Sequence, residues 1–257
     1  MKLKLFLPVL LIAVMMGCSP KSTPTEAPAT NTNTRVPPTS TPTPIPPTAS
    51  QTPRPSPITA PSPTEIVPGA VLFEEDFEDG IADNLVYSWG GWRASSEDNG
   101  NKVYEVNTNT EASIQYNRPA SLGFGSKEWT NYSAEYRVKM LNAKANTWLS
   151  FRSDIGANRD HYVEWLSAEY DGISLHINLN GSGWNLLKDL SLPVWDERWY
   201  QVRVEAQGST LRVYLDDNLM LQTEDTSIAS GVLELGVFPG THALFDDIRV
   251  VALGDSP

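Results

Sequence analysis

Beyond Ala70 the sequence alternates between apolar and polar residues, and this alternation limits the possible folds more than any other feature. In the segment NYSAEYRVKM, every second residue from Tyr132 to Met140 is apolar, and the residues between them are polar or charged. Successive side chains of a β-strand point to opposite faces of the sheet. The segment is therefore predicted to be a strand with one buried and one solvated face.

The same period of two recurs through the rest of the chain. It is present in DGISLHINLN, in VRVEAQGSTLRVYL, in GVLELGVF and in ALFDDIRVVAL. Asn180-Gly181 and Gln207-Gly208 lie between such runs and are typical of hairpin turns. Roughly a dozen short strands are expected, and no segment has a convincing helical stripe. The sequence predicts an all-β fold, an antiparallel two-sheet jelly-roll sandwich.

Prolines and tryptophans divide the chain into two parts. Fifteen of the 20 prolines lie between Pro20 and Pro68, and all eight tryptophans lie at Trp89 or later. Proline fixes φ and removes a backbone donor, and a segment so poor in large apolar residues cannot form a core. Residues 18–68 are therefore predicted to be a disordered Pro/Thr-rich linker, and residues 69–254 to be the sandwich domain.

The first 17 residues are predicted to be a lipoprotein signal peptide. Lys2 and Lys4 precede an apolar stretch, Leu5 to Met16, that is too short for a comfortable transmembrane helix. The following AVMMGCSP resembles the bacterial lipobox, although Met15 stands where Leu is most common. The resemblance implies that Cys18 is diacylated and anchors the chain to a membrane. The alternative is an ordinary secretory signal with a chance cysteine.

The lipobox also implies a location in the cell envelope, on the extracellular or periplasmic side. The predicted domain is acidic, since residues 69–257 hold 14 Lys and Arg against 29 Asp and Glu. An acidic surface without a basic stripe repels phosphate backbones, so nucleic acid is not an expected partner. We expect a monomer.

Five segments occur in a recognisable order between residues 70 and 253. They are LFEEDFEDG, TWLSFRS, HYVEWLSAEYDGISLHINLNGSGWNLL, ERWYQVRVEAQGSTLRVYLDDNLML and GVLELGVFPGTHALFDDIRV. Together they resemble the concanavalin A-like lectin/glucanase superfamily, in particular its laminin-G-like and 3-keto-disaccharide hydrolase-like branches. The resemblance implies two curved sheets, with sugar or protein ligands on the concave sheet or its rim loops. It does not by itself imply catalysis.

Aromatic rings and a guanidinium are the candidates for ligand contact, because sugars stack on rings and hydrogen-bond to polar groups. The candidate ligand-binding residues are Trp148, Arg152, Trp89, Trp92, Trp165 and Trp184. In TWLSFRS, alternation predicts that Trp148 and Arg152 share the face opposite to Leu149 and Phe151. The alternative is that most of these aromatic residues pack in the interior or at sheet edges.

Acidic residues at the start of the domain suggest two further kinds of site. Glu74, Asp76 and Glu78 have the Glu-x-Asp-x-Glu spacing of family 16 glycoside hydrolases, and period two would place them on one face. Glu75 replaces the expected apolar residue, and the motif lies in the first strand instead of the middle of the domain. We assign no catalytic residues from it.

Structural calcium is the only cofactor that we consider, because Ca²⁺ prefers carboxylate oxygens. If the first and last strands pair, Glu75 or Asp76 would lie near Asp246 or Asp247, and Asp76 and Asp246 are the candidate metal ligands. The alternative is that both are solvent-exposed acids on paired edges.

The preferred interpretation is an envelope-anchored lipoprotein whose lectin-like sandwich binds extracellular glycans. One alternative is an enzyme, either a glycoside hydrolase or a 3-keto-glycoside hydrolase-like protein acting on extracellular glycans. Another is a non-catalytic adhesion or structural domain of laminin-G type.

Overall fold

The computed structural model describes residues 67–154 and 159–255, which fall within the compact unit formed by residues 61–257. The predicted signal peptide, Cys18 and nearly all of the linker lie outside the described residues. In the described ranges, no helix is long and apolar enough to cross a membrane.

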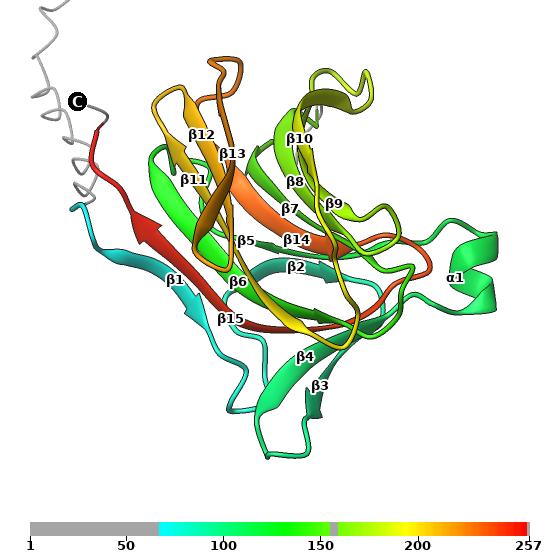
Figure 1. The fold of residues 1–257 in the computed structure, drawn as a ribbon. Helices are drawn as coiled ribbons and strands as arrows, with labels where there is room; N and C mark the ends of the chain where they lie inside the picture. Colours follow the sequence, from blue (N-terminus) through cyan, green and yellow to red (C-terminus); the bar gives the residue numbers. More distant parts are fainter. Residues whose placement is uncertain (1–66, 155–158, 256–257) are drawn as a thin grey trace, which may run out of the picture. The chain divides into compact units, whose positions relative to one another are not determined.

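The domain consists of two antiparallel sheets (Figure 1). The larger sheet has eight strands, and β1 (Val71–Glu75) joins it by pairing with β15. The other seven strands are, in spatial order, β13 (Asn218–Glu224), β12 (Thr210–Leu215), β11 (Trp199–Gln207), β6 (Tyr132–Met140), β15 (His242–Ala252), β4 (Lys102–Asn107) and β3 (Trp92–Ser96).

The second sheet has seven strands. Their spatial order is β10 (Asn185–Ser191), β9 (Gly172–Asn178), β8 (His161–Ser167), β7 (Asn146–Ser153), β14 (Val232–Val237), β5 (Ala120–Phe124) and β2 (Leu85–Trp89). Strands from the beginning, middle and end of the domain are neighbours in both sheets, as in Greek-key and jelly-roll connections. The predicted all-β, two-sheet antiparallel sandwich is confirmed.

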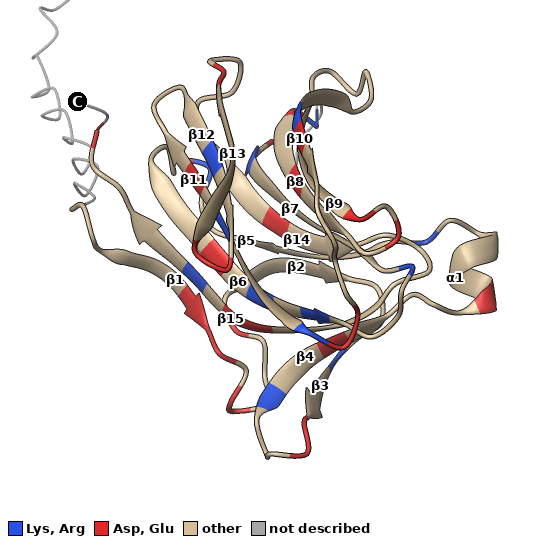
Figure 2. Cartoon of the chain, viewed as in Figure 1, with Lys and Arg blue, Asp and Glu red and all other residues tan. Residues whose placement is uncertain are grey.

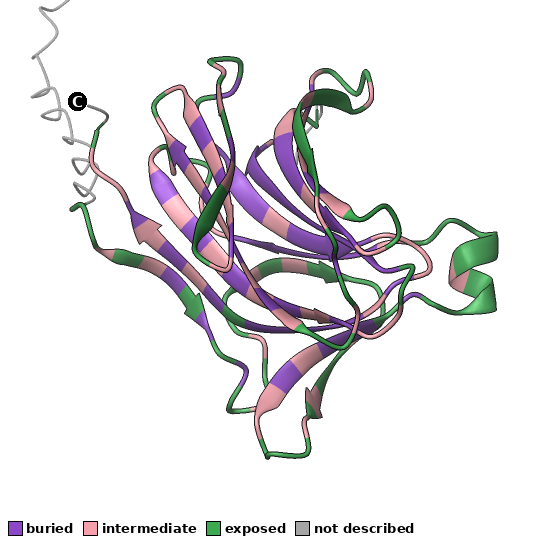
Figure 3. Cartoon of the chain, viewed as in Figure 1, coloured by how far each residue is buried: buried purple, intermediate pink, exposed green. Residues whose placement is uncertain are grey.

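The core lies between the two sheets and follows the alternation seen in the sequence. Along β6 the residues from Tyr132 to Met140 are buried and half-buried in strict turn, and β11 shows the same pattern. Figure 3 shows this as bands of two colours along these strands. Fully burying one aliphatic or aromatic side chain contributes about 1.5–3 kcal/mol. The apolar set of each strand therefore determines which face points inward.

The first and last strands pair, with Glu75 opposite Ile248, so the condition for the candidate calcium site is met. The predicted hairpin at Gln207-Gly208 joins β11 to β12, and Gly208 takes the left-handed conformation, φ 57°, that such a turn needs. The chain also contains a short helix, α1 (Glu111–Gln115), that the sequence interpretation missed. Five residues are too few for a helical stripe, and the local signal is the cap, in which the Thr110 hydroxyl accepts a hydrogen bond from the Ser113 N–H.

The outer face of the eight-stranded sheet is charged and ion-paired. Arg137 on β6 bonds to Asp247 on β15 at 2.9 Å, and the Arg203 guanidinium lies 3.7 Å from the centre of the Tyr214 ring. In the view of Figure 2, basic residues are interspersed with acidic ones on the strands. This face has the character of a solvated surface, unlike the outer face of the other sheet.

Candidate functional site

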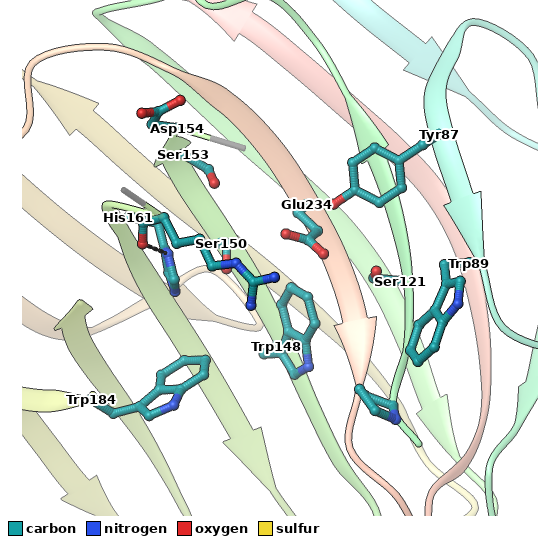
Figure 4. Close-up of a pocket in the computed structure, with 12 residues that line it drawn as sticks. Tyr87, Trp89, Ser121, Trp148, Ser150, Ser153, Asp154, His161, Trp184 and Glu234 are labelled. Carbon is teal, nitrogen blue, oxygen red and sulfur yellow. Dashed lines mark hydrogen bonds between the residues drawn. The ribbon is translucent and has the colours of Figure 1, made fainter. Parts of the chain in front are cut away.

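A cavity of about 550 Å³ lies on the outer face of the seven-stranded sheet (Figure 4). We call it the Trp148 cavity. It extends over β2, β5, β14, β7 and β8. Four aromatic side chains line it: Tyr87, Trp89, Trp148 and Trp184. Its polar lining includes Ser121, Ser150, Asp154, Arg159, His161 and Glu234.

Period two in β7 brings Trp148 and Ser150 to the cavity. Leu149 and Phe151, which alternate with them, belong to the core cluster. In β14, Glu234 and Gly236 point outward in the same way, while the residues beside them are buried. Each strand therefore supplies an apolar residue to the core and the next residue to the cavity.

Two glycines make room for aromatic rings that lie across neighbouring strands. A Cβ atom on Gly236 of β14 would come within 2.2 Å of the Trp148 ring. A Cβ atom on Gly123 of β5 would come equally close to the Tyr87 ring, at 2.2 Å. Glycine in a strand interior weakens the strand, and it often marks a close approach. Here the two glycines let the Trp148 and Tyr87 rings lie directly on the sheet, where the rings cannot rotate freely.

The polar groups of the cavity have defined roles in hydrogen bonding. The Tyr87 hydroxyl bonds to the Glu234 carboxylate, and burial together with this bond raises the pKa of Tyr87, so the hydroxyl stays a donor. Burial lowers the pKa of His161, which favours the neutral imidazole. Its Nδ1 lies 2.7 Å from the Arg159 carbonyl oxygen and must donate to it. The Nε2 of a neutral His161 is then an acceptor.

Two of the lining rings are open to solvent. Trp89 is 52% exposed and Trp184 is 44% exposed, whereas Trp148 is only 7% exposed. Trp184 packs edge-on against His161, with ring centres 5.5 Å apart. Trp148 is therefore a fixed floor, and Trp89 and Trp184 are exposed rings at the margin.

The structure divides the sequence-predicted ligand residues into three groups. Trp148, Trp89 and Trp184 meet in the Trp148 cavity. Trp165 lies beside this cavity on the same face, and its ring packs against Phe238. Trp92 points into the interior, where its ring stacks on Tyr104. For Trp92 the geometry matches the alternative interpretation of interior packing.

Arg152 does not share the outer face with Trp148, so that expectation is wrong. Its side chain is buried. The guanidinium donates to the carbonyl oxygens of Thr130, at 2.8 Å, and Ile228, at 3.0 Å. Arg152 thus ties together segments at one end of the sandwich and contributes nothing to the lining of the cavity.

A β-bulge causes this inversion. Pairing between β7 and β14 shifts register between Val232 and Glu234, and Arg152 itself has φ 47°. Gly231 packs against this point, since a Cβ on it would lie 2.3 Å from the Arg152 carbonyl carbon. Simple alternation assigns Arg152 to the cavity side of β7. The bulge reverses this, and Ser153 lines the cavity instead.

Tyr87, Glu234 and His161 are lining residues that sequence reasoning did not select. Tyr87 and Trp89 stand two residues apart in LVYSW, a spacing that places both rings on one face of a strand. In GVLELGVF, the outward positions hold Glu234 and Gly236, a carboxylate next to a position without a side chain. Both patterns were available as signals. His161 carried no such signal, because it stands alone.

The acidic residues of the first strand do not form a single-faced triad, so the expected arrangement is wrong. Strand β1 ends at Glu75, and Phe77 takes φ 58° and is buried. Glu74 pairs with Arg249 on the neighbouring strand β15 of the same sheet, at 3.4 Å. Glu78 lies beyond the strand and accepts a bond from the Lys102 N–H at 3.2 Å.

Asp246 is held by polar side chains. It accepts a hydrogen bond from the Asn101 side chain at 2.9 Å and lies 3.6 Å from the Arg137 guanidinium. Asp76, the other candidate ligand, accepts a hydrogen bond from the Glu78 N–H. Burial raises the pKa of Asp246. Within residues 67–154 and 159–255, no three His, Cys, Asp or Glu side chains are grouped to hold a metal ion. Calcium binding at Asp76 and Asp246 stays a prediction.

No protein-family model matches the chain. A levanase of Bacillus subtilis is 26% identical over 117 residues, a match that covers 46% of this chain and 17% of the levanase. The chain thus spans less than a fifth of the length of that curated relative.

Solved structures resemble the domain more extensively. The carbohydrate-binding module CBM66 from Bacillus subtilis matches with a TM-score of 0.50 and 19% identity, over 64% of this chain and 97% of the module. A Bacillus subtilis protein of unknown function with a galectin-like fold matches with a TM-score of 0.56 and 9% identity, over 75% and 100% of the two chains. In fold, the domain is a two-sheet antiparallel β-sandwich similar to a carbohydrate-binding module and to a galectin-like protein, which agrees with the fold implied by the resemblance to concanavalin A-like proteins.

Proposed function

We propose that this domain binds carbohydrate and that the Trp148 cavity is its binding site. The observation that carries the proposal is the pair of rings that lie on Gly236 and Gly123. Replacing Ala by Gly in a strand costs about 0.5–1 kcal/mol. A sheet that contains two such glycines on its outer face gives up stability, and in return it holds the Trp148 and Tyr87 rings flat as the floor of the cavity.

The lining fits the chemistry of a sugar. The apolar C–H face of a pyranose or furanose ring can stack on Trp148, Trp89 or Trp184. Its hydroxyls can donate to Glu234, to His161 Nε2 and to the lone pairs of the Tyr87 oxygen. A few convergent polar groups among aromatic rings are typical of small-molecule sites. The neighbours named above, a levanase and a carbohydrate-binding module, support the same class of ligand.

We further propose that the domain is displayed from a membrane surface. Acylation of Cys18 would anchor the chain, and each buried CH₂ contributes about 0.8 kcal/mol to membrane binding. The proline-rich residues 18–68 could then reach on the order of 150 Å in polyproline II conformation, at about 3.1 Å per residue. Such a spacer lets the sandwich reach glycans outside the cell envelope.

The test is a binding screen with the full chain carrying Cys18→Ala, which keeps it free of acyl groups. The probes are levan, cellulose, galactan, mannan and a glycan array, measured with and without EDTA. At least one saccharide should bind, and Trp148→Ala should weaken that binding by about tenfold or more. Absence of binding to every probe would overturn the proposal.

Trp195→Ala is the matched control. Trp195 is also a tryptophan, is 64% exposed, and lines none of the cavities described for this domain. Its removal should leave binding unchanged. Equal losses in the two variants would mean that the Trp148 cavity has no special role.

A further inference from the structure

A second cavity, of about 250 Å³, lies on the same outer face of the seven-stranded sheet, over β8, β9 and β10. We call it the Tyr170 cavity. The residues of these strands that face it are the outward ones, including Trp165, Ser174, His176 and Asp189. Ile173, Leu175 and Ile177 alternate with them in β9 and are buried. The two cavities therefore share one continuous sheet surface.

A ridge of three aromatic rings connects the two cavities. The Trp165 ring lies 4.6 Å from the Phe238 ring and 6.3 Å from the Trp184 ring, measured between centres. Trp184 lines the Trp148 cavity, and Trp165 lines the Tyr170 cavity. Phe238 also packs near Trp148, at 6.3 Å. A ligand that leaves one cavity thus meets aromatic surface all the way to the other.

Both cavities reach β8, but the groups of the Trp148 cavity on β7 lie more than one sugar unit from those of the Tyr170 cavity on β9 and β10. Neighbouring strands are about 4.8 Å apart, so β7 and β9 are separated by about 10 Å, and β7 and β10 by about 14 Å. Trp148 and Ser150 belong to β7, whereas Ser174 belongs to β9 and Asp189 to β10. Only a ligand with several linked units could occupy both cavities.

The Tyr170 cavity offers both stacking and polar groups. Tyr170 is 70% exposed and Leu186 is 55% exposed, so apolar surface faces solvent here. His176 Nε2 lies 2.9 Å from the Ser174 hydroxyl, and burial lowers the pKa of His176, which favours its neutral form. Asp189 on the adjacent strand adds a carboxylate that can accept from sugar hydroxyls.

Among residues 67–154 and 159–255, two buried donor or acceptor atoms on or beside the ridge have no hydrogen-bond partner. They are the Nε1 atom of Trp165 and the Nδ1 atom of His176. Buried polar atoms are normally hydrogen-bonded, and an unpaired one costs about 1–3 kcal/mol. A small movement of either ring on ligand binding would expose these atoms to a sugar hydroxyl.

We propose that the Tyr170 cavity is a second sugar subsite and that the domain binds an internal stretch of a linear oligosaccharide across both cavities. This inference rests on the proposed carbohydrate-binding function. It adds that the ligand is a chain of at least about three units, rather than a single terminal sugar held in one pocket.

The experiment measures affinity against chain length by titration calorimetry with the full chain carrying Cys18→Ala. The probes are levan oligosaccharides of one to six units, and the same series from whichever screened polysaccharide binds most tightly. Affinity should rise by about tenfold or more between two and five units. Tyr170→Ala and Asp189→Ala should remove most of that rise without changing the affinity for the disaccharide.

Tyr116→Ala is the control, since Tyr116 is 61% exposed and lines neither cavity. If short saccharides bind but longer ones gain nothing, the second subsite is refuted while the first site stands. The same holds if Tyr170→Ala and Tyr116→Ala behave alike. If no probe of any length binds, both proposals are overturned.

Discussion

Tyr136 and Glu164 join the two sheets through the middle of the core. The Tyr136 hydroxyl, on β6, donates a hydrogen bond of 2.9 Å to the Glu164 carboxyl group on β8. Both side chains are buried. Removal from water disfavours the charged form, and burial raises the pKa of Glu164 to about 8.

This carboxyl group should make the domain less stable as the pH rises. The folded state holds the Glu164 proton more tightly than the unfolded state, where the pKa is near 4.5. The favourable contribution is therefore complete below about pH 4.5 and disappears as the pH rises toward 8. The expected loss is on the order of 3–5 kcal/mol.

Glu164→Gln should remove that dependence, because glutamine cannot ionise and its amide oxygen can still accept from Tyr136. We expect similar unfolding free energies for the two proteins near pH 4.5, and a more stable variant at pH 9. Denaturant unfolding across this range measures the difference. A wild-type curve that stays parallel to the variant curve would show that Glu164 titrates normally.

Gly236→Ala tests whether the sheet must be bare beneath the Trp148 ring. The new methyl group would occupy space 2.2 Å from that ring and force the indole out of the cavity floor. Affinity for the saccharide selected in the screen should fall by about tenfold. Gly91→Ala is the control, because no atom of the described residues lies within 4 Å of its Cβ position. Unchanged affinity in Gly236→Ala would show that the Trp148 ring is not part of the binding site.

Arg152→Ala should damage stability and spare recognition. The variant leaves the carbonyl oxygens of Thr130 and Ile228 without their Arg152 donors, and the bond to Ile228 is buried. Unfolding free energy should fall by about 2–4 kcal/mol. Calorimetric affinity of the remaining folded protein should match the wild type. If circular dichroism shows a fully folded variant that has nevertheless lost affinity, Arg152 takes part in binding.

The anchor is tested in cells that produce the full chain. Growth with radioactive palmitate should label the wild-type protein, and Cys18→Ala should abolish the label, since Cys18 is the chain's one cysteine. The variant should also leave the membrane fraction. Label that survives in Cys18→Ala, or a wild-type protein that is never labelled, would contradict the lipobox interpretation.

The sandwich was predictable because its information is local. Alternation over residues 132–140 predicts which side chains are buried, and in the structure each of those side chains is buried. The same rule correctly placed Trp148 opposite Leu149, on the outer face. It failed four residues after Trp148, at Arg152, because a bulge depends on the partner strand and on Gly231, which lies far away in the sequence.

The rest of the site depends on packing between distant segments. Trp92 and Trp89 are separated by two glycines, yet one ring enters the core and the other lines the cavity. Composition cannot distinguish them. Glu234 acquires its role only when β14 lies between β5 and β7, an order of strands that no local pattern reveals.

The most direct test follows the eight tryptophan indole N–H signals by nuclear magnetic resonance during a saccharide titration. Single Trp→Phe variants assign each signal. If the outer face of the seven-stranded sheet is the binding surface, the signals of Trp148, Trp89 and Trp184 shift with a common dissociation constant, and those of Trp195 and Trp199 stay in place. Shifts confined to Trp195 and Trp199 would contradict carbohydrate binding in the Trp148 cavity.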